Sequence, residues 1–453
     1  MTVVFAVFGS LGDVHPMIAV ALELKRRGHQ VAFAAMEGYR EKIELLGFGF
    51  RPMRPNFDHD DRELVKKVMD VKSGPPFLIR ELLLPNLRPM FDDLLAAVDG
   101  ADVLVSGEVV FAARSVAEKS NLGWVTTTLA PGTFLSPTDP FIPPTAMWLR
   151  HFRWIGRPFF GPMLALAKRV IGGWFEPYRR FRAELGLPEH RDPLFDGKSA
   201  ELHLAMFSGS LGEPQPDWPA SAVQTGFCFY DGQLDLGEMP LGLEEFLDAG
   251  EPPIVFTLGS AAVMDARDFF TESAKAAKLL GRRALLLYGT LNDVPRLDES
   301  GDWKIATGSE ASSKIAAFDY APYSKVFPRA ACVVHQGGVG TTAQVMRAGV
   351  PHLVMPYSHD QPDNAARCER LGIGRIIGRY RYDARRAALE IGKILGDESY
   401  SSKARAISAT IRTETGAETA ADSIENLLLR RDANSGNPMG ADHRGGINCR
   451  NVV

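Results

Sequence analysis

Residues 3–35 read VVFAVFGSLGDVHPMIAVALELKRRGHQVAFAA and contain one complete unit of an α/β fold. The runs at 3–8 and 30–35 are almost entirely apolar, which is typical of strands that a parallel sheet buries on both faces. Between them lie a turn-rich loop at 9–16 and a helical spacing of apolar residues at 17–27. The stretch therefore predicts a strand, a helix and a second parallel strand, joined as a βαβ unit.

The same alternation continues over the rest of the chain in two separate runs. The first closes with a strand at 201–207, and the second begins at 254, after a stretch at 229–253 that is rich in Pro, Gly and acidic residues. Ligands of such sheets bind at the carboxyl ends of the strands, so we expect a cleft between two α/β halves. Further strands are expected at 102–106, 124–129, 283–288, 304–306, 331–335 and 351–355, and further helices at 39–46, 87–98, 111–120 and 268–280 and from Thr341.

The composition excludes several classes of function. A net charge of -4 lacks the basic excess with which proteins bind nucleic acid. Cys228, Cys332, Cys368 and Cys449 are far apart and show no metal-ligand spacing, so we expect free thiols and no metal. The apolar start of the chain has no basic leader, and no stretch approaches the roughly 18 apolar residues of a membrane span. We therefore expect a protein of the cytoplasm or of its membrane surface.

The run His335-Gln336-Gly337-Gly338-Val339-Gly340-Thr341-Thr342 follows an apolar strand and precedes a predicted helix. Glycines let the backbone approach a ligand closely, and the unpaired N–H groups of a helix's first turn bind anions. Thr341 adds a hydroxyl donor, and His335 at the tip of the strand can donate from its ring. The pattern favours a nucleotide diphosphate, although many glycine-rich turns of this kind bind no ligand. Dinucleotide and ATP binding are weaker alternatives, because the spacing is not GxGxxG and no P-loop lysine follows.

A second polar loop, His359-Asp360-Gln361-Pro362-Asp363-Asn364, follows the next predicted strand. Its acid and amide side chains supply acceptors and donors together, which is what recognition of neighbouring sugar hydroxyls requires. Taken alone, such a loop is more often a solvated one. Its place one strand after the glycine-rich run favours a sugar site.

With Tyr320-Ala321-Pro322, Arg347-Ala348-Gly349-Val350-Pro351 and Asp360-Gln361, the glycine-rich run resembles the donor-binding signature of family-1 glycosyltransferases. It is most similar to the branch of rhamnolipid rhamnosyltransferases and sterol glucosyltransferases, and the resemblance covers residues 3–430. It implies the GT-B fold, in which two Rossmann-like doubly wound domains face a cleft. It further implies inverting, metal-independent transfer of a hexose, without a cofactor, from a dTDP- or UDP-sugar to a hydrophobic or lipid-like acceptor.

The resemblance also assigns site residues. His335 would contact the α-phosphate of the donor, Tyr320 would take the place of a Trp that stacks on the base, and Asp360 with Gln361 would hold the sugar. Plant-type relatives grip the ribose diol with a Glu, and Gln344 stands there in this chain, which favours a donor without a 2′-hydroxyl such as a dTDP-sugar. The remaining residues expected around the donor are Gly12, Ser260, Gly337, Gly338, Gly340 and Thr341.

An inverting displacement needs one general base for the acceptor hydroxyl, and the loop at 9–16 offers two candidates. The resemblance places the base at Asp13, three residues before the proline. His15 stays in contention because the ordinary pKa of histidine lies near neutrality. Asp13 also suits the N-cap of the following helix, which is a purely structural role. Glu108 is expected to be an ordinary surface residue, with a role beside the base as the lesser alternative.

Between 147 and 182, eight Lys or Arg residues and many aromatic residues stand against one acid, Glu176. Cationic and aromatic side chains interleaved on helices suit lipid headgroups or the mouth of an apolar acceptor pocket. A helix pair that packs its aromatic residues into the core is the structural alternative. The sequence thus leaves open a peripheral contact of residues 147–182 with the inner face of the membrane.

Two other functions fit the same scaffold. A nucleotide-sugar epimerase would need further acids around the anomeric carbon, and a non-catalytic binding or activator protein would not need to keep Asp13, His335 and Asp360-Gln361. The predicted division of the chain is an acceptor-binding domain at 1–230, a linker at 231–252, a nucleotide-sugar-binding domain at 253–415, a helix at 416–431 that crosses back to the first domain, and a disordered tail at 432–453.

Overall fold

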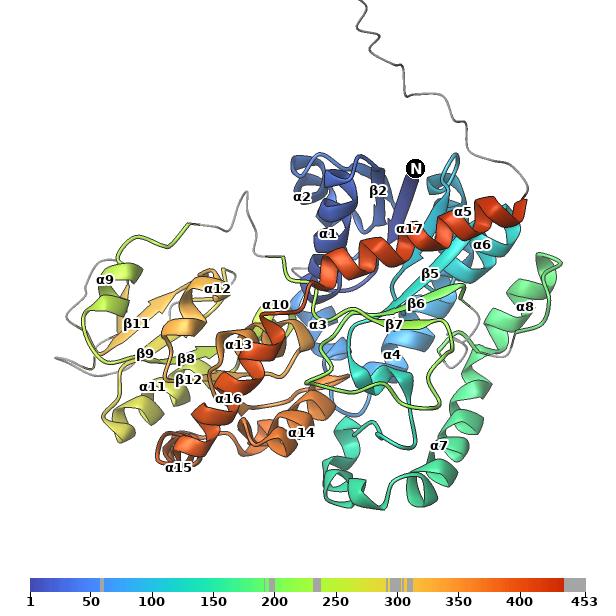
Figure 1. The fold of residues 1–453 in the computed structure, drawn as a ribbon. Helices are drawn as coiled ribbons and strands as arrows, with labels where there is room; N and C mark the ends of the chain where they lie inside the picture. The colour runs from blue at the N-terminus through green and yellow to red at the C-terminus, as the bar shows by residue number, and fades with distance from the viewer. Residues whose placement is uncertain are drawn as a thin grey trace, which may run out of the picture.

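Two parallel sheets of seven strands organise the molecule, one in each half of the chain (Figure 1). The computed structural model describes residues 1–57, 61–190, 192–194, 200–230, 238–290, 292–293, 303, 305–307 and 313–435. The strand order is β3-β2-β1-β4-β5-β6-β7 in the first sheet and β10-β11-β9-β8-β12-β13-β14 in the second. The predicted fold class, α/β with two doubly wound halves, is confirmed.

The first half contains strands β1 (Thr2–Ala6), β2 (Gln30–Ala35), β3 (Gly49–Pro52), β4 (Val103–Ser106), β5 (Gly123–Thr128), β6 (Leu202–Ala205) and β7 (Ala222–Gln224). Its helices are α1 (Leu11–Arg26), α2 (Arg40–Leu45), α3 (Arg62–Val68), α4 (Gly74–Phe77), α5 (Leu87–Ala97), α6 (Ala113–Ser120), α7 (Arg157–Gly172) and α8 (Glu176–Glu184). The described residues of this half also form a π-helix, η2 (Leu78–Leu83), and five 3-10 helices, which are η1 (Glu37–Tyr39), η3 (Leu84–Asn86), η4 (Pro131–Phe134), η5 (Pro144–Ile155) and η6 (Gly173–Phe175).

The second half contains strands β8 (Ile254–Thr257), β9 (Ala284–Leu287), β10 (Ile305–Thr307), β11 (Ile315–Phe318), β12 (Cys332–His335), β13 (His352–Val354) and β14 (Gly374–Ile376). Its helices are α9 (Leu243–Asp248), α10 (Gly259–Ala262), α11 (Phe269–Leu280), α12 (Tyr323–Val326), α13 (Val339–Ala348), α14 (Gln361–Leu371), α15 (Ala384–Leu395), α16 (Glu398–Ile411) and α17 (Gly416–Ser435). Shorter turns are η8 (Val263–Asp265), η10 (Phe327–Arg329) and η11 (Arg379–Arg381).

The strand order places a crevice in each sheet. The order changes direction between β1 and β4 in the first sheet and between β8 and β12 in the second. Loops that leave two neighbouring strands at such a point turn to opposite faces of the sheet, and ligands bind in the gap. Here these are the loops that carry Asp13, Glu108, Ser260 and the glycine-rich run.

Helix α1 begins at Leu11 and not at the predicted Met17. The hydroxyl of the N-cap, Ser10, accepts the Gly12 N–H at 3.2 Å, while the Asp13 carboxylate accepts the Ser10 N–H at 2.7 Å. This capping box pairs donors that the first turn of a helix otherwise leaves unpaired. Pro16 lies inside the helix and removes one backbone hydrogen bond, a loss that the cap offsets. The loop predicted over 9–16 was therefore wrong beyond Ser10.

Four strands of three or four residues, β3, β7, β11 and β14, are missing from the sequence prediction. Runs this short carry no readable periodicity, and pairing with the neighbouring strand is what makes them strands. Because β7 follows β6, the strand predicted at 201–207 does not close the first half. In the predicted linker at 231–252, α9 packs Leu243 and Phe246 into the core of the second half, so that half begins before residue 253.

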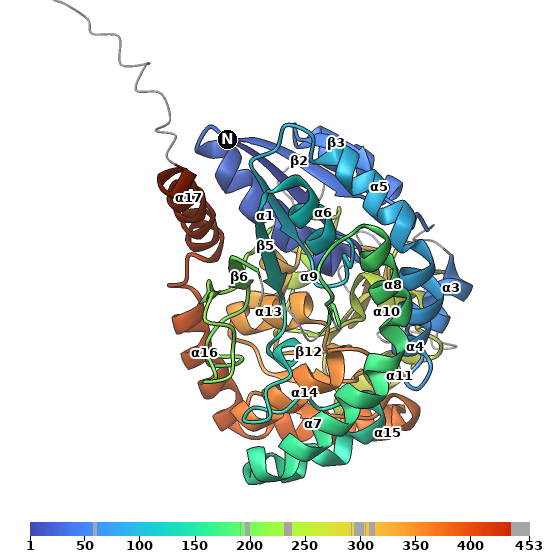
Figure 2. The same cartoon turned by 90° about the vertical axis from the view of Figure 1, so that its right-hand side faces the viewer.

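Helix α17 returns from the second half and packs along α1 (Figures 1 and 2). Arg27, the C-cap of α1, binds Asp422 and Glu425 of α17 at 2.5 and 2.6 Å. Of the tail predicted to be disordered at 432–453, residues 432–435 continue α17 and the others lie outside the described residues.

A cluster of four largely buried charged side chains, with the exposed Arg370 at its edge, joins the region from η4 to η5 to α14. Asp363 accepts from Arg367 Nε at 2.6 Å and from Arg153 Nη1 at 3.1 Å. Asp139 pairs with Arg367, with Arg153 at 2.5 Å and with Arg370 at 3.0 Å. Burial by itself would raise the pKa of Asp139, but the three guanidinium groups hold it below its ordinary value. These ion pairs anchor the first half to α14, the helix that begins at the predicted sugar ligands Asp360 and Gln361.

We expect Asp363→Asn to lower the free energy of unfolding by about 3 kcal/mol, because it leaves two buried guanidinium groups, Arg153 and Arg367, with Asp139 as their one shared carboxylate. Urea unfolding followed by tryptophan fluorescence measures the change. Glu44→Gln, which removes an exposed partner of Arg40 on α2, is the matched control and should cost less than about 0.5 kcal/mol. Equal stability of the two variants would contradict the anchoring role of the cluster.

Candidate active site

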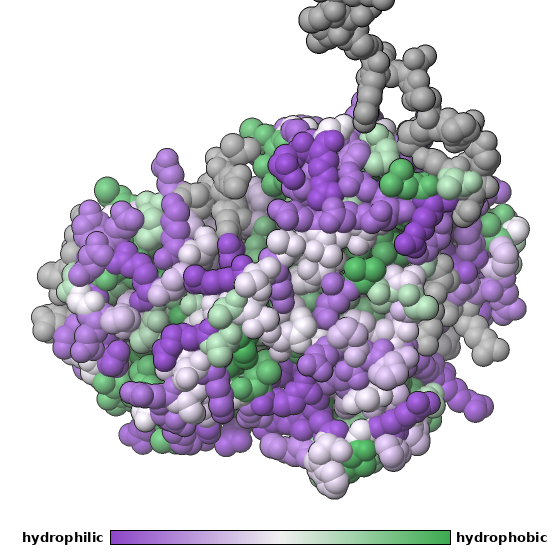
Figure 3. Space-filling view, in the orientation of Figure 1, coloured by the Kyte–Doolittle hydropathy of each residue, from purple (hydrophilic) through white to green (hydrophobic). Residues whose placement is uncertain are grey.

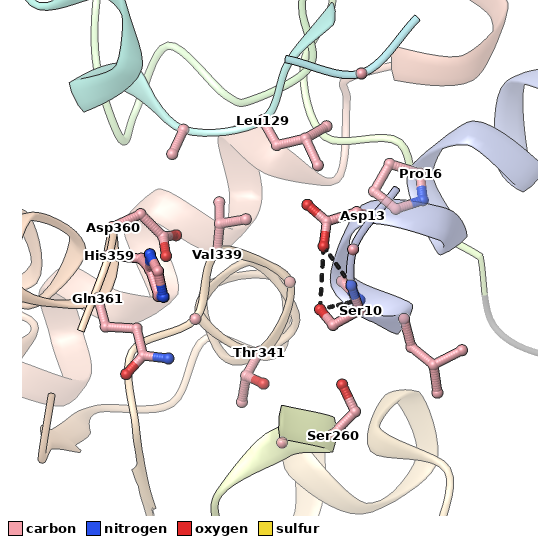
Figure 4. A pocket seen from close by; sticks show the side chains of 18 of the residues that line it. Ser10, Asp13, Pro16, Leu129, Ser260, Val339, Thr341, His359, Asp360 and Gln361 are labelled. Atoms are coloured by element: carbon pink, nitrogen blue, oxygen red, sulfur yellow. Dashed lines mark hydrogen bonds between the residues drawn. The ribbon is translucent and has the colours of Figure 1, made fainter. Parts of the chain in front are cut away.

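One large cavity lies between the two halves and has a volume of about 1200 Å³. The loops after β1, β4, β8, β12 and β13 supply its polar wall, while α3, η2 and α7 supply much of its apolar wall. Figure 4 shows Asp13 on one side of the cavity, Asp360 and Gln361 on the other, and Ser260 and Thr341 between them. The loops that the sequence singled out in each half therefore share a single cavity.

Asp13 lies in the first turn of α1, half-buried at the cavity wall. Its Oδ2 accepts the backbone N–H of Ser10 at 2.7 Å and the Ser10 hydroxyl at 3.2 Å (Figure 4). Removal from bulk water raises the pKa of Asp13 to about 6, although these hydrogen bonds act in the opposite direction. The carboxylate is consequently a stronger base than that of an ordinary aspartate, and it is still mostly ionised at neutral pH. Asp13 combines the helix-capping role with a position on the cavity.

His15 follows two positions later on α1, which places it about 200° around the helix from Asp13. Its ring packs edge-on against Tyr230, with the ring centroids 5.1 Å apart, and both rings line the cavity. The two candidate bases thus point to different sides of α1. Of the two, Asp13 is the one whose charge contributes to the pKa of Asp360 across the cleft.

Glu108, in the loop after β4, also lines the cavity, so the expectation of a surface residue was wrong. Burial raises the pKa of Glu108 to about 8, and the charges of Asp13 and Asp360 add to the shift. Its Oε1 is buried without a hydrogen-bond partner among the described residues. Glu108 is therefore mostly protonated at neutral pH. Its place directly after an apolar strand is the sequence signal that could have identified it.

The glycine-rich turn presents the N-terminal end of α13 to the cavity. The helix begins at Val339 with Gly338 as its N-cap. Gly337 has a φ of +88°, and a Cβ there would lie 3.0 Å from the carbonyl oxygen of Gln361, so glycine is required. Gly340 lines the cavity and has open space where a Cβ would lie. Unpaired N–H groups of the first helical turn consequently face the open space.

The position of His335 differs from the expected one. Its ring is fully buried, its Nδ1 accepts the Gly337 N–H at 3.0 Å, and its Nε2 bonds to Nδ1 of His352 at 3.0 Å. Because Nδ1 accepts, the proton is on Nε2, and burial lowers the pKa of His335 to about 3. Both nitrogens of the neutral ring are thus used inside the protein. His335 shapes the turn from behind the cavity wall, as Gly337 does, and its expected contact with a phosphate finds no support in this arrangement.

Asp360 and Gln361 lie at the start of α14, on the cavity wall. Burial raises the pKa of Asp360 to about 6, although the carboxylate accepts hydrogen bonds from Asn364 and from the backbone of Val339. The Oε1 atom of Gln361 accepts the Tyr357 N–H at 2.9 Å. The group that Gln361 offers to the cavity is therefore its NH2.

Asn364 joins the two loops of the second half, a role that sequence reasoning missed. Its Nδ2 donates to Asp360 Oδ2 at 2.7 Å and to the carbonyl oxygen of Gly337 at 3.0 Å. The side chain is fully buried. It therefore fixes the turn at Asp360, which the sequence predicts to bind the sugar, against the glycine-rich turn.

The remaining expected donor residues line the same cavity. Ser260 and Thr341 both line the cavity (Figure 4), and Gln336, which the sequence did not single out, approaches the Thr341 hydroxyl through Nε2 at 3.5 Å. Among the described residues there is no group of three or more His, Cys, Asp or Glu that could hold a metal ion. The expected residues at the wall are Gly12, Ser260, Tyr320, Gly338, Gly340, Thr341 and Gln344.

Comparison with known proteins identifies the family. Residues 3–119 match the model of the glycosyltransferase family 28 N-terminal domain, and residues 307–427 match that of the erythromycin biosynthesis protein CIII-like C-terminal domain. An O-mycaminosyltylonolide 6-deoxyallosyltransferase from Streptomyces fradiae is 30% identical, over 95% of this chain and 98% of its own. The chain belongs to the family-1 glycosyltransferases.

One further relative and one solved structure extend the comparison. A sterol 3-beta-glucosyltransferase from Cryptococcus neoformans var. neoformans serotype D is 27% identical over 94% of this chain and 27% of its own length. The solved structure of a spinosyn rhamnosyltransferase complexed with thymidine diphosphate has a TM-score of 0.62 at 16% identity, over 94% of this chain and 100% of its own. The two sheets thus form the GT-B fold, and the enzyme transfers a sugar. The alternatives of an epimerase and a non-catalytic protein receive no support from these relatives.

The raised pKa of Asp13 makes the stability of this glycosyltransferase depend on pH. The fold favours the protonated carboxyl, so the stability from protonation is complete below about pH 4 and is lost as the pH rises through 6. Asp13→Asn has no charge to desolvate and should be more stable than the wild type at pH 8 by about 1 to 2 kcal/mol. Urea midpoints at pH 8 and pH 4 test this. A difference that is the same at both pH values would show that the Asp13 charge is not destabilised by burial.

Proposed function

We propose that this glycosyltransferase moves a hexose, rhamnose or glucose, from a dTDP- or UDP-sugar to a hydroxyl of a hydrophobic acceptor, with inversion and without a metal ion. The observation that carries the proposal is that Asp13 and the N-terminal end of α13 come from different halves and line one cavity. A base and an anion site on two walls of one space are what an in-line displacement at the anomeric carbon needs.

The N-terminal end of α13 suits the diphosphate of the donor. Val339 N–H already bonds to Asp360, which leaves the N–H groups of Gly340 and Thr341 for phosphate oxygens. The hydroxyls of Thr341 and Ser260 supply further donors beside them (Figure 4). The helix dipole adds about half a positive charge at this end. These groups stabilise the negative charge of the leaving diphosphate, the task that a bound metal ion performs in other transferases.

Asp13 is the proposed general base. As the acceptor oxygen forms its bond to the anomeric carbon, its proton passes to the free oxygen of Asp13, and the bond from that carbon to the phosphate oxygen breaks. The electron pair leaves with the nucleoside diphosphate, and the configuration inverts. Glu108, protonated at neutral pH, keeps the cavity from holding three negative carboxylates at once. Asp13 can therefore stay ionised beside it.

Asp360 and Gln361 are the proposed sugar ligands. The carboxylate accepts from sugar hydroxyls and the Gln361 NH2 donates to them, so that neighbouring hydroxyls meet both kinds of partner. Gln344 at the cavity wall is a neutral residue near the expected ribose, which favours a dTDP donor. The thymidine diphosphate named for the spinosyn rhamnosyltransferase structure is consistent with this choice.

We expect Asp13→Asn to lower kcat at least about 100-fold while changing the affinity for dTDP less than about twofold, because it removes a base and no donor contact. His15→Ala should lose less than about tenfold. Release of dTDP from dTDP-rhamnose and dTDP-glucose in the presence of sterol or macrolide alcohols gives the rate, and thermal shift with dTDP and UDP gives donor binding. In the wild type, kcat/KM should fall as the pH drops below about 6, where Asp13 becomes protonated. Near-wild-type turnover by Asp13→Asn would refute the assignment.

The acceptor side of the cavity is strongly apolar. Met163, Ala167 and Ile171 on one face of α7 line it together with α3 and η2. A cavity of about 1200 Å³ with such walls fits a large, greasy acceptor whose hydroxyl reaches Asp13. This supports a sterol-like, macrolide-like or lipid-like alcohol as the acceptor class.

We also propose a cytoplasmic location with peripheral contact to the inner face of the membrane, which the outer surface of η5 and α7 supports. Trp154 is 82% exposed, and Trp148, Leu166 and Val170 are exposed with it. Figure 3 shows green and pale atoms beside purple ones at the lower end of the molecule, where α7 lies in Figure 1. No helix among the described residues is long and apolar enough to span a bilayer.

Aromatic residues and cations on one surface are typical of interfacial binding. The exposed cations here are Arg157, Lys168 and Arg169.

Co-sedimentation with phosphatidylcholine vesicles that contain phosphatidylglycerol tests the membrane contact. Replacing Arg157, Lys168 and Arg169 by Glu should weaken binding at least about tenfold, because each cation near an anionic surface contributes about 1 kcal/mol. Arg153 is left unchanged because it belongs to the buried ion cluster. The control variant replaces three exposed cations on α6, α15 and α16 by Glu, so that its net charge equals that of the test variant. Equal sedimentation of both variants would rule out this surface. The control positions are Lys119, Arg385 and Lys403.

A further inference from the structure

Residues 61–78, which we call the α3–α4 segment, belong to the first half but dock on the second. Met69 is buried in the core of the second half, in the same cluster as Met264 and Met355. Leu64 and Val68 line the cavity from this segment. The segment is thus a wall of the proposed acceptor site that rests on the sugar-binding half.

Two hydrogen bonds hold the end of α3 to the turn that precedes α14. The Nε2 atom of His359 bonds to the carbonyl oxygen of Val68 at 2.9 Å, and the Ser358 hydroxyl donates to the carbonyl oxygen of Asp70 at 3.2 Å. Val68 is the last residue of α3, where carbonyls have no partner within the helix. His359 therefore supplies a donor that the helix end lacks. Since a carbonyl only accepts, Nε2 carries the proton in this contact.

The backbone of His359 has an uncommon conformation. Its φ of +55° lies in the left-handed region, which glycine adopts freely and residues with a Cβ adopt uncommonly, although histidine does so more often than most of them. Burial lowers the pKa of His359, so the ring is neutral. The next two residues along the chain are Asp360 and Gln361. Strain is therefore stored at the residue that directly precedes the proposed sugar ligands, and the ring's contact with the α3–α4 segment compensates it.

We propose that His359 is a positioning residue that couples the acceptor wall to the sugar ligands. Through its bond to Val68, a filled acceptor site holds the α3–α4 segment against the turn, and the turn holds Asp360 and Gln361 in place. The same contact keeps the wall closed over the donor, so that the acceptor hydroxyl and not water attacks the anomeric carbon. This inference rests on the proposed function in two respects, the assignment of the sugar to Asp360 and Gln361 and that of the acceptor to the space beside the α3–α4 segment.

His359→Gly is the decisive variant, because glycine accepts the left-handed backbone and removes only the ring. His359→Asn is its conservative partner, since asparagine tolerates the same conformation and can donate from its amide. We expect His359→Gly to raise the acceptor KM about fivefold to tenfold, the range for one lost hydrogen bond. Hydrolysis of dTDP-glucose to glucose and dTDP should rise by a similar factor relative to transfer. Affinity for dTDP itself should change less than about twofold, and His359→Asn should recover most of the wild-type ratio.

Hydrogen–deuterium exchange provides a readout that needs no turnover. Amides of residues 62–78 should exchange at least about fivefold faster in His359→Gly than in the wild type, and dTDP-glucose should slow them in the wild type only. Unchanged exchange, or faster exchange with an unchanged ratio of hydrolysis to transfer, would overturn the proposal. If the wild type transferred neither dTDP- nor UDP-sugars, the proposed function would fail. The exchange experiment would still decide whether His359 holds the segment.

Discussion

Asp363 and Arg367, neighbours on α14, pair in the interior with Arg153 and Asp139 of the first half, and the shape of the cleft depends on these contacts. Charges removed from water in this way gain little net stability, because the cost of desolvation roughly cancels their attraction. We interpret the pair as a constraint on geometry. With Asp139 and Arg153 it allows one seating of the η4–η5 region on α14, and α14 carries Asp360 and Gln361 at its start. The anchor and the sugar loop are thus neighbours on one helix.

Within this cleft, the Asp13 carboxyl group and the positive end of the α13 helix dipole lie on different walls. Three carboxyl groups from two halves share a space with apolar walls, so each is harder to ionise than in water, and Glu108 most of all. The end of α13 brings the opposite partial charge without a side chain. An anionic diphosphate is therefore favoured at one wall and a proton acceptor at the other. Neither half of the chain could produce this separation alone.

Several polar side chains near the cavity serve the fold and the site together. Asp13 closes the capping box of α1 with one oxygen and offers the other to the cavity. His335 and Asn364 fix the glycine-rich turn from behind, and His359 carries a strained backbone for the sake of a contact across the cleft. Hydrogen bonds behind a site keep its groups from relaxing into other rotamers, which is what an active site needs before substrate arrives.

The sequence by itself determined the βαβ pattern, the glycine-rich strand-to-helix turn and the polar loop at Asp360, because periodicity, glycine and caps act over a few neighbouring residues. Ser10 and Asp13, which form the capping box, also mark the start of α1 in the local sequence. Because Pro16 follows them closely, the local pattern instead predicted a loop there, and this start was missed. Only the tertiary structure decided that the His335 ring turns inward to His352 on the next strand and that Glu108 lines the cavity, partly buried. The packing of the α3–α4 segment, which belongs to the first half, on the core of the second half is likewise visible only in the tertiary structure. Burial and pairing depend on groups that the chain brings from far away, and no local pattern contains them.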